Sequence, residues 1–275
     1  MDFEVVPAHE LLLADQAKVF KDAFAGYLIG SIEMDAAGLG RFVCAQGVDL
    51  CFSRFVRKPN AALAGFGYIN RTGNVPRLGA MGIAPNARRT GAAAYLLSHL
   101  LEEAKERGDK AMVLEVFEQN TPAHSLYRRF GFRELTRLFG WRCKGNTITT
   151  AQELCEISPL TAMRMSSVFE YPDMPWQISR YAVAKLSGAR VFCLNNAAVV
   201  IGDPDLSPVR VHAFFGHDAD NWSSVRNVMA AVLQKFPGSE FFAPPIFPEQ
   251  FGVEIFGPLG FIREPLNQFL MRCDL

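Results

Sequence analysis

The chain has 275 residues, of which 49% are hydrophobic and 20% are charged, which suits a folded protein with one large core or two of average size. Its 28 Lys and Arg residues balance its 28 Asp and Glu residues. This balance argues against a protein that coats nucleic acid without sequence preference. The apolar stretches fall short of the roughly 20 residues of a membrane span, and the first residues lack the pattern of a signal peptide. We therefore expect a cytoplasmic protein that binds neither nucleic acid nor membrane.

The six cysteines and five histidines show no metal-binding or disulfide pattern. The cysteines form no C-x-x-C pair, and the histidines form no pair at i, i+4 on a helix. We expect reduced thiols and no metal ion.

The first part of the chain predicts a strand, two helices and then three strands. These elements cover residues 3–6, 9–24, 35–45, 50–56, 63–70 and 75–84. Turn-forming residues separate the three strands at 58–60 and 71–74, so we expect an antiparallel meander.

A helix over residues 90–107 follows the meander, and Gly108 ends it as a C-terminal cap. A strand is expected over 111–117, and a short helix begins at Thr121-Pro122, where Thr can cap and Pro suits the first turn. A strand over 132–142 closes this half, and another helix is expected near 160–169.

The same order of elements recurs, with weaker sequence similarity, about 129 residues later. This indicates an internal duplication. Gly131-Phe132 corresponds to Gly260-Phe261, and the apolar stripe of the 90–107 helix corresponds to that of a later helix. The neutral total charge hides an asymmetry, because residues 1–145 carry a net positive charge and the rest a matching negative one. An anionic ligand therefore belongs with the first half.

The segment from Ile83 to Ala94, IAPNARRTGAAA, has the properties of an anion site. It joins a predicted strand to a predicted helix, and the first turn of a helix carries unpaired backbone N–H groups and a partial positive charge. Gly91 and the alanines after it leave that backbone accessible. Arg88 and Arg89 add two guanidinium groups, whose planar sets of N–H donors suit phosphate oxygens. Together these residues predict a site for a pyrophosphate-sized group.

This segment is neither a P-loop nor a dinucleotide fingerprint, because the required glycines and lysine are missing. The pattern Arg88-x-x-Gly91-x-Ala93 resembles the acyl-CoA pyrophosphate loop of the GNAT superfamily of N-acyltransferases. The run Asn120-x-x-Ala123-x-x-Leu126-Tyr127-x-x-Phe130-Gly131-Phe132 resembles the second motif of that family, at a matching distance. The resemblance covers about residues 1–145 directly and the rest through the repeat.

The resemblance implies an α/β (α+β) protein with two tandem GNAT-like sheets, mixed but mainly antiparallel and flanked by helices. Residues 1–145 would form the catalytic, acyl-CoA-binding domain, and residues 146–275 would form a degenerate copy of it. The strands at 78–84 and 111–117 would run side by side and then splay apart to admit the pantetheine arm. Gly79 and Gly82 suit a strand that bulges or admits a ligand closely, although glycine in a strand can also be a plain defect.

The resemblance also assigns residues to acetyl-CoA, or a related short acyl-CoA, as the acyl donor. Backbone groups of Met81 and Ile83 would bind the pantetheine, and Asn120 and Ala123 would border it. The pyrophosphate would lie on Arg88, Arg89, Thr90, Gly91, Ala92, Ala93 and Ala94.

Tyr127 would lie near the thioester sulfur and protonate the departing CoA thiolate, while a primary amine attacks the carbonyl directly. Its other interpretation is an aromatic that only packs on a short helix. The base that takes the proton of the amine stays unassigned, because residues 78–84 contain no acid. The candidates are a water chain, Glu115, Glu118, Glu33 and His124.

The second half lacks the residues of the anion site. At the offset of 129 the counterparts of Arg88, Arg89, Gly91 and Ala93 are His217, Asp218, Asp220 and Trp222. The counterpart of Tyr127 is Phe256, and the counterpart of Asn120 is Glu249. We therefore expect no CoA site there, and three roles stay open: walling the acceptor pocket, stabilising the first half, or forming a homodimer.

Two other functions stay open. A non-catalytic CoA-binding sensor would keep the donor site without a base, and a transferase could use a larger acyl or aminoacyl donor. The acceptor also stays open between a small amine, an amino acid, an antibiotic and a protein N-terminus.

Overall fold

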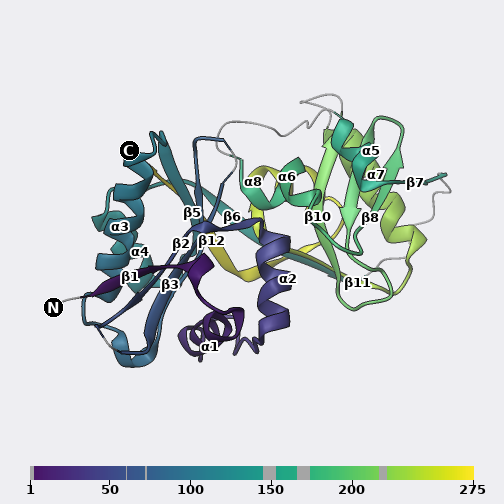
Figure 1. Cartoon of the computed structure of the whole chain (residues 1–275). Helices are drawn as coiled ribbons and strands as arrows, with labels where there is room; N and C mark the ends of the chain where they lie inside the picture. The colour runs from purple at the N-terminus through teal and green to yellow at the C-terminus, as the bar shows by residue number, and fades with distance from the viewer. Residues whose placement is uncertain (1–2, 60, 72, 145–152, 166–173, 217–221) are drawn as a thin grey trace. The chain divides into compact units, whose positions relative to one another are not determined.

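The computed structural model describes the whole chain except residues 1–2, 60, 72, 145–152, 166–173 and 217–221 (Figure 1). The chain forms two compact units. Unit 1 comprises Met1–Glu134 and Leu270–Leu275, and unit 2 comprises Leu135–Phe269. The last residues of the chain thus return to the unit that the first residues build.

Unit 1 is a sheet with helices on both faces. Its strands run in the spatial order β1 (Glu4–Pro7), β2 (Val48–Arg57), β3 (Leu63–Asn70), β4 (Arg77–Ile83), β5 (Ala111–Phe117) and the end of β12 (Ile262–Asp274). Its helices are α1 (Leu13–Ala23), α2 (Ala36–Gln46), α3 (Ala92–Glu106) and α4 (Thr121–Arg129), with 3₁₀ turns at Ala8–Glu10 and Pro85–Ala87. The expected meander is confirmed, because β2, β3 and β4 pair antiparallel in sequence order.

Alternation along β3 directs its side chains to opposite helices. Phe66 stacks on Phe20 of α1 with ring centroids 5.1 Å apart. Gly67, the next residue, faces the other way, where an added Cβ would lie 2.6 Å from Leu100 of α3. The sheet of unit 1 therefore separates two buried layers, and the predicted apolar stripe of α3 lies in one of them.

The helix that we expected from residue 9 begins later, at Leu13. Residues before it form a 3₁₀ turn and an extended N-cap, Leu12. The buried side chain of Gln16 explains this start, because its Nε2 donates to the carbonyl oxygens of Ala8 (2.8 Å) and Leu11 (3.0 Å) and so holds the preceding segment. Similarly, α5 (Pro159–Arg164) is shorter than the expected 160–169 helix, whose last residues lie outside the described part of the chain.

Unit 2 has its own core. Its strands run in the order β6 (Arg133–Lys144), β11 (Glu240–Pro248), β10 (Val209–Gly216), β9 (Ala197–Ile201), β8 (Arg190–Leu194) and β7 (Cys155–Ile157), and β12 lies beside β6. Its other elements are α5, α6 (Arg180–Val183), α7 (Trp222–Lys235), α8 (Glu249–Phe251), the 3₁₀ turn Trp176–Ile178 and the π-helical turn Gly252–Phe256. Buried side chains of α7, such as Val228 and Met229, pack in this core.

The offset of 129 residues relates elements of the two units. It maps residues 93–106, nearly all of α3, onto α7. In unit 1 the Phe132 N–H donates to the Tyr127 carbonyl oxygen at 3.1 Å, and in unit 2 the Phe261 N–H donates to that of Phe256 at 2.9 Å. Gly131 and Gly260, in these two turns, have φ values of 88° and 79°. The two turns are thus built alike at the residues that the sequence repeat aligned.

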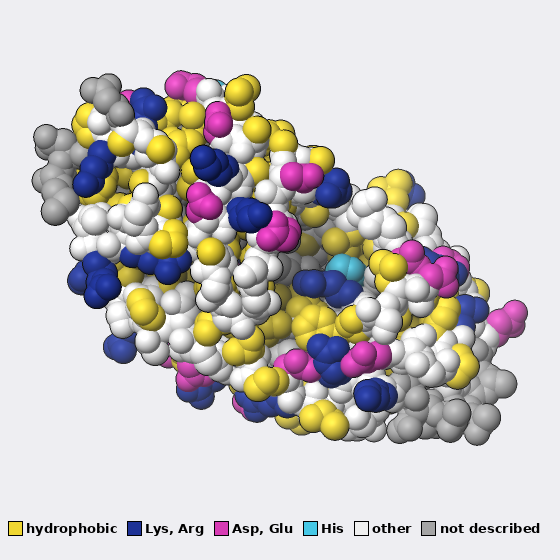
Figure 2. Space-filling model, turned by 90° about the horizontal axis from the view of Figure 1, so that it is seen from below, with side chains coloured by type: hydrophobic (Ala, Val, Ile, Leu, Met, Phe, Trp, Pro, Cys, Tyr) yellow, Lys and Arg dark blue, Asp and Glu magenta, His cyan; other side chains and the backbone are white. Residues whose placement is uncertain are grey.

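The surface mixes the two signs of charge. Figure 2 shows basic and acidic side chains interspersed on the face that it displays. Arg142, for example, contacts both Glu264 (2.6 Å) and Glu240 (3.1 Å). Within the described residues, no helix is long and apolar enough to cross a membrane.

Candidate active site

The parallel strands β4 and β5 separate soon after they meet. In the described structure they pair at Arg77 with Val113 and at Leu78 with Leu114, and at no residue beyond. Gly79 comes directly after these pairs and is the extra residue of a bulge, because Leu78 opposes Ile69 while Ala80 opposes Tyr68. The predicted splay is confirmed, and so is the bulge that Gly79 suggested.

The hydrogen-bond register directs backbone groups of β4 into the resulting gap. Ala84 N–H donates to the Ala64 carbonyl oxygen at 2.8 Å, so residues 84 and 64 form a hydrogen-bonded pair. Because such pairs alternate along an antiparallel ladder, the N–H and C=O groups of Met81 and Ile83 point away from β3. They face the side from which β5 has departed, where an extended ligand could bind them.

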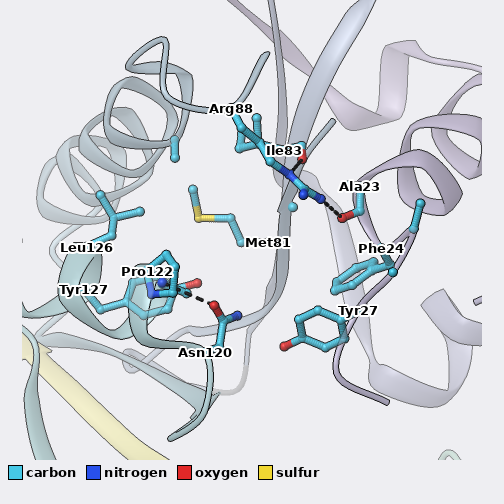
Figure 3. A pocket seen from close by; sticks show the side chains of 15 residues that line it. Ala23, Phe24, Tyr27, Met81, Ile83, Arg88, Asn120, Pro122, Leu126 and Tyr127 are labelled. Atoms are coloured by element: carbon cyan, nitrogen blue, oxygen red, sulfur yellow. Dashed lines mark hydrogen bonds between the residues drawn. The ribbon is translucent and has the colours of Figure 1, made fainter. Parts of the chain in front are cut away.

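A cavity of about 330 Å³ occupies this gap (Figure 3). Its walls come from the end of α1 and the following loop, from β4, from the start of α3 and from α4. They consist of Ala23, Phe24, Ala25, Gly26, Tyr27, Met81, Gly82, Ile83, Arg88, Ala93, Asn120, Pro122, Ala123, Leu126 and Tyr127. Seven of the residues that the sequence assigned to the donor thus line one cavity, namely Met81, Ile83, Arg88, Ala93, Asn120, Ala123 and Tyr127.

The N-terminus of α3 reaches this cavity uncapped. Gly91, the N-cap residue, has φ 94°, a left-handed conformation that favours glycine, and makes no side-chain cap. The first N–H groups of an α-helix have no partner within it, and the side chains here are the small Ala92, Ala93 and Ala94. Thr90 stabilises the turn by donating its hydroxyl to the Ala87 carbonyl oxygen at 2.7 Å. These residues form an accessible and electropositive first turn.

Both arginines of this turn are exposed, but they differ in their hydrogen bonds and backbone conformation. The Arg88 guanidinium donates from Nε to the Ile83 carbonyl oxygen (3.2 Å) and from Nη2 to the Ala23 carbonyl oxygen (3.1 Å). Arg88 therefore joins the end of β4 to the end of α1. Arg89 is exposed and has φ 60°, an unusual conformation for a residue with a side chain.

Tyr127 is buried, with 7% of its surface exposed, and its ring packs edge-on against Phe132 at 5.7 Å between centroids. Burial, together with the nearby phenol of Tyr27, raises the pKa of Tyr127 well above its ordinary value. The phenol therefore keeps its proton throughout the physiological pH range. It packs in the core, as its alternative interpretation required, and it also lines the cavity.

Tyr27 is a cavity residue that the sequence did not reveal. It follows Gly26 in the loop after α1, and no motif marks it. Burial raises the pKa of Tyr27, and the neighbouring side chain of Asn120 acts in the opposite direction. Asn120 accepts the Ala123 N–H at Oδ1 (3.4 Å). Figure 3 shows Asn120 between the two tyrosines.

The four candidate bases lie outside the cavity lining. Glu115 of β5 is buried and paired to Arg77, with 2.7 Å from Oε2 to Nε. Glu118 follows β5 and has interactions of its own. Glu33 contacts Lys21 at the surface (2.6 Å), and His124 of α4 contacts Glu134 (2.8 Å). In the described residues no group of three or more metal-binding side chains is placed to hold a metal ion.

In unit 2, the residues aligned with the donor site have apolar or charged surroundings. Trp222 begins α7 and packs edge-on against Phe251 at 5.2 Å, and Phe256, aligned with Tyr127, is fully buried. Glu249, aligned with Asn120, lies 3.8 Å from Arg263. His217, Asp218 and Asp220 lie outside the described residues.

Part of the chain matches a known protein family. Residues 21–132 match the model of the acetyltransferase (GNAT) family. No curated protein sequence matches the chain significantly.

Solved structures resemble the chain over its whole length. A proposed acetyltransferase from Pyrococcus horikoshii has a TM-score of 0.66 at 15% identity, covering 100% of this chain and 89% of its own. A tandem GNAT protein from the clavulanic acid biosynthesis pathway has a TM-score of 0.65 at 12% identity, covering 99% and 98%. A GCN5-related N-acetyltransferase from Sphaerobacter thermophilus has a TM-score of 0.63 at 12% identity, covering 99% and 95%. At these identities the likeness shows the fold.

The chain therefore has a GNAT fold, and its residues 21–132 match a family of acyltransferases. Residues 21–132, which contain the cavity and the α3 turn, form its GNAT acetyltransferase domain.

Proposed function

We propose that unit 1 binds acetyl-CoA, or another short acyl-CoA, and transfers the acyl group directly to a primary amine. The observation that carries this proposal is the junction of three features. The backbone of Met81 and Ile83 faces a gap between two splayed strands, the uncapped turn of α3 reaches that gap, and a buried phenol lines it.

The donor fits these residues by its chemistry. A pyrophosphate would bind the N–H groups of Gly91, Ala92, Ala93 and Ala94, with Thr90 shaping the turn and Arg88 and Arg89 supplying positive charge. An amide-containing arm would add to the free edge of β4 at Met81 and Ile83, as an extra strand does. Asn120 and Ala123 would border this arm, which places its thiol end near Tyr127.

The reaction forms a bond between the amine nitrogen and the acyl carbon and breaks the bond between that carbon and sulfur. The amine loses a proton, and the departing thiolate gains one. Tyr127 donates this proton from its phenol to the sulfur, and burial raises the pKa of the thiol as it raises that of the phenol. Arg88 and the aromatic side chains position the reactants, which contributes much of the acceleration.

The second half stays a degenerate copy in this proposal, with residues 1–145 and 146–275 as the two copies of one repeat. Phe256 has no hydroxyl group and cannot donate a proton as Tyr127 can. Trp222 places a large side chain at the first turn of α7, where α3 has a small alanine. We place the reaction in the cytoplasm, because all six cysteines are free thiols, as reducing compartments favour.

A CoA-binding protein without turnover is the second candidate. It is favoured by the absence of any acid or histidine among the described residues that line the cavity. If Glu115 or Glu118 serves as the base, it must act through water, since neither reaches the lining.

The test is the release of free thiol from acetyl-CoA in the presence of a panel of amines, with the wild type and the Tyr127→Phe variant. We expect release by the wild type and a loss of roughly 10²- to 10⁴-fold in kcat for the variant. CoA affinity should stay unchanged, because phenylalanine keeps the packing against Phe132. CoA binding with no thiol release from any amine would favour the second candidate.

A further inference from the structure

We propose that the acceptor is a weakly basic primary amine on an aromatic or apolar group, and that it enters the cavity as a neutral nitrogen. This inference rests on the proposed acyl transfer and names the substrate class of the same site. Three observations carry it: the charge of the lining, the engagement of the nearby acids, and the aromatic wall around Tyr27.

The cavity lining disfavours the binding of an ammonium ion. Among its described residues the sole charged side chain is Arg88, which is cationic, and the two phenols keep their protons because their pKa values are raised. Moving an unpaired ammonium into surroundings that hold no carboxylate is costly. A neutral amine avoids this cost.

The acids nearest in sequence to the lining already have partners. Glu115 is held by Arg77, and its side chain is only 3% exposed. Glu33 and Glu134 are paired with Lys21 and His124. Glu118 also has interactions of its own. None of these carboxylates lines the cavity, so none is placed to hold or deprotonate an ammonium there.

The aromatic wall indicates the group that carries the amine. The Tyr27 ring meets Phe24 edge-on at 4.9 Å and Phe117 edge-on at 6.1 Å between centroids. Phe24 and Tyr27 both line the cavity, so one face of it is made of rings that pack on each other. Rings prefer to pack on such a surface in edge-to-face or offset contacts. The wall therefore suits a flat, apolar substituent.

The cost of losing a proton separates the amine classes. At pH 7.4 an alkyl amine like that of lysine, with a pKa near 10.4, is neutral in about one molecule in a thousand. An α-amine, with a pKa near 7.8, is neutral in about one in four. An arylamine is already neutral. Without a base in the cavity, rates should follow this order.

The experiment measures thiol release from acetyl-CoA by the intact wild-type protein with three amines that share a phenyl ring: aniline, phenylalaninamide and 2-phenylethylamine. At pH 7.4 we expect kcat/KM to be at least about 100-fold lower for 2-phenylethylamine than for the better of the other two. Its kcat/KM should rise about tenfold per pH unit from pH 6.5 to 8.5, while that of aniline stays flat. The ratio of kcat/KM for aniline to that for phenylalaninamide shows whether the site prefers an arylamine or an α-amine.

Two results would overturn the inference while leaving the proposed function intact. One is preferred use of 2-phenylethylamine at pH 7.4. The other is an acid limb in the aniline profile, which would reveal a titrating base. No thiol release from any amine would instead overturn acyl transfer itself.

Two variants test the wall independently of the base. Tyr27→Ala should raise KM for phenylalaninamide about tenfold, whereas Tyr27→Phe should keep KM within about threefold of the wild type. Equal KM values for the wild type and Tyr27→Ala would contradict the aromatic wall.

Discussion

The guanidinium of Arg88 donates a hydrogen bond to the carbonyl oxygen of Ala23 at 3.1 Å, which links the turn before α3 to the last residue of α1. A second bond from the same side chain reaches the Ile83 carbonyl oxygen. One residue of the turn before α3 thus also holds the loop that brings Phe24 and Tyr27 to the cavity. In the proposed reaction, this arginine would act on both donor and acceptor.

Replacing Arg88 separates its charge from its geometry. Arg88→Lys keeps the charge but cannot bridge two carbonyl oxygens with a planar fork. We expect both Arg88→Lys and Arg88→Ala to weaken CoA binding about tenfold or more in calorimetry, and both to raise KM for the amine. If Arg88→Lys matches the wild type in both respects, the charge alone matters and the bridge does not.

The left-handed conformation of Gly91 should make its replacement costly. An added Cβ would meet no atom within 4 Å, so the cost of Gly91→Ala is backbone strain, about 1–2 kcal/mol of unfolding free energy. The control is Gly40→Ala in α2, where φ is ordinary and the nearest atom is 4.0 Å away. That change should stabilise by about 0.5–1 kcal/mol. Chemical denaturation of both variants should therefore give opposite signs.

The buried pair of Arg77 and Glu115 should act on stability. Their side chains are 6% and 3% exposed, so Glu115→Gln leaves a buried guanidinium without its counter-charge. We expect a loss of about 3 kcal/mol in unfolding free energy, with kcat of the folded variant within about threefold of the wild type.

A matched measurement on Glu118→Gln completes this comparison. A fall of kcat by 100-fold or more in Glu115→Gln, without a comparable loss of stability, would identify Glu115 as the base instead. The same fall confined to Glu118→Gln would assign the base to Glu118.

His212 of β10 should make unit 2 sensitive to acid. Burial, and then the charge of Arg210, lower the pKa of His212 from 6.5 to about 3. Between these values the unfolded chain binds a proton that the folded chain does not, so stability falls as pH drops from 6.5 towards 3. His212→Phe should remove on the order of 1–3 kcal/mol of this loss, as followed by urea denaturation at pH 7 and pH 4.

Features fixed by local sequence were predictable. The strands at 63–70 and 111–117 have the predicted bounds, and Gly79 marks the bulge after which β4 leaves β5. These outcomes depend on apolar alternation and on glycine, whose effects act within a few residues.

Features made by contacts between distant segments were not predictable. Tyr27 lies in a loop without a motif, and it enters the site because Arg88, 61 positions later, holds the end of α1. The return of Leu270–Leu275 to unit 1 likewise depends on strand pairing across the whole chain. Gln16 delays the start of α1 through carbonyl contacts that no periodicity records.

Titration calorimetry of CoA into the wild type, Ala93→Asp and Ala93→Asn measures whether the first turn of α3 binds the diphosphate of an acyl-CoA, as we propose. A carboxylate in a first helical turn stabilises the helix, so Ala93→Asp should fold, yet it would repel a diphosphate at that turn. We expect measurable heat of binding for the wild type, a weakened affinity for Ala93→Asn, and at least about a 100-fold loss for Ala93→Asp, about 2.7 kcal/mol. Undiminished binding by Ala93→Asp, or no binding by the wild type, would refute diphosphate binding at this turn.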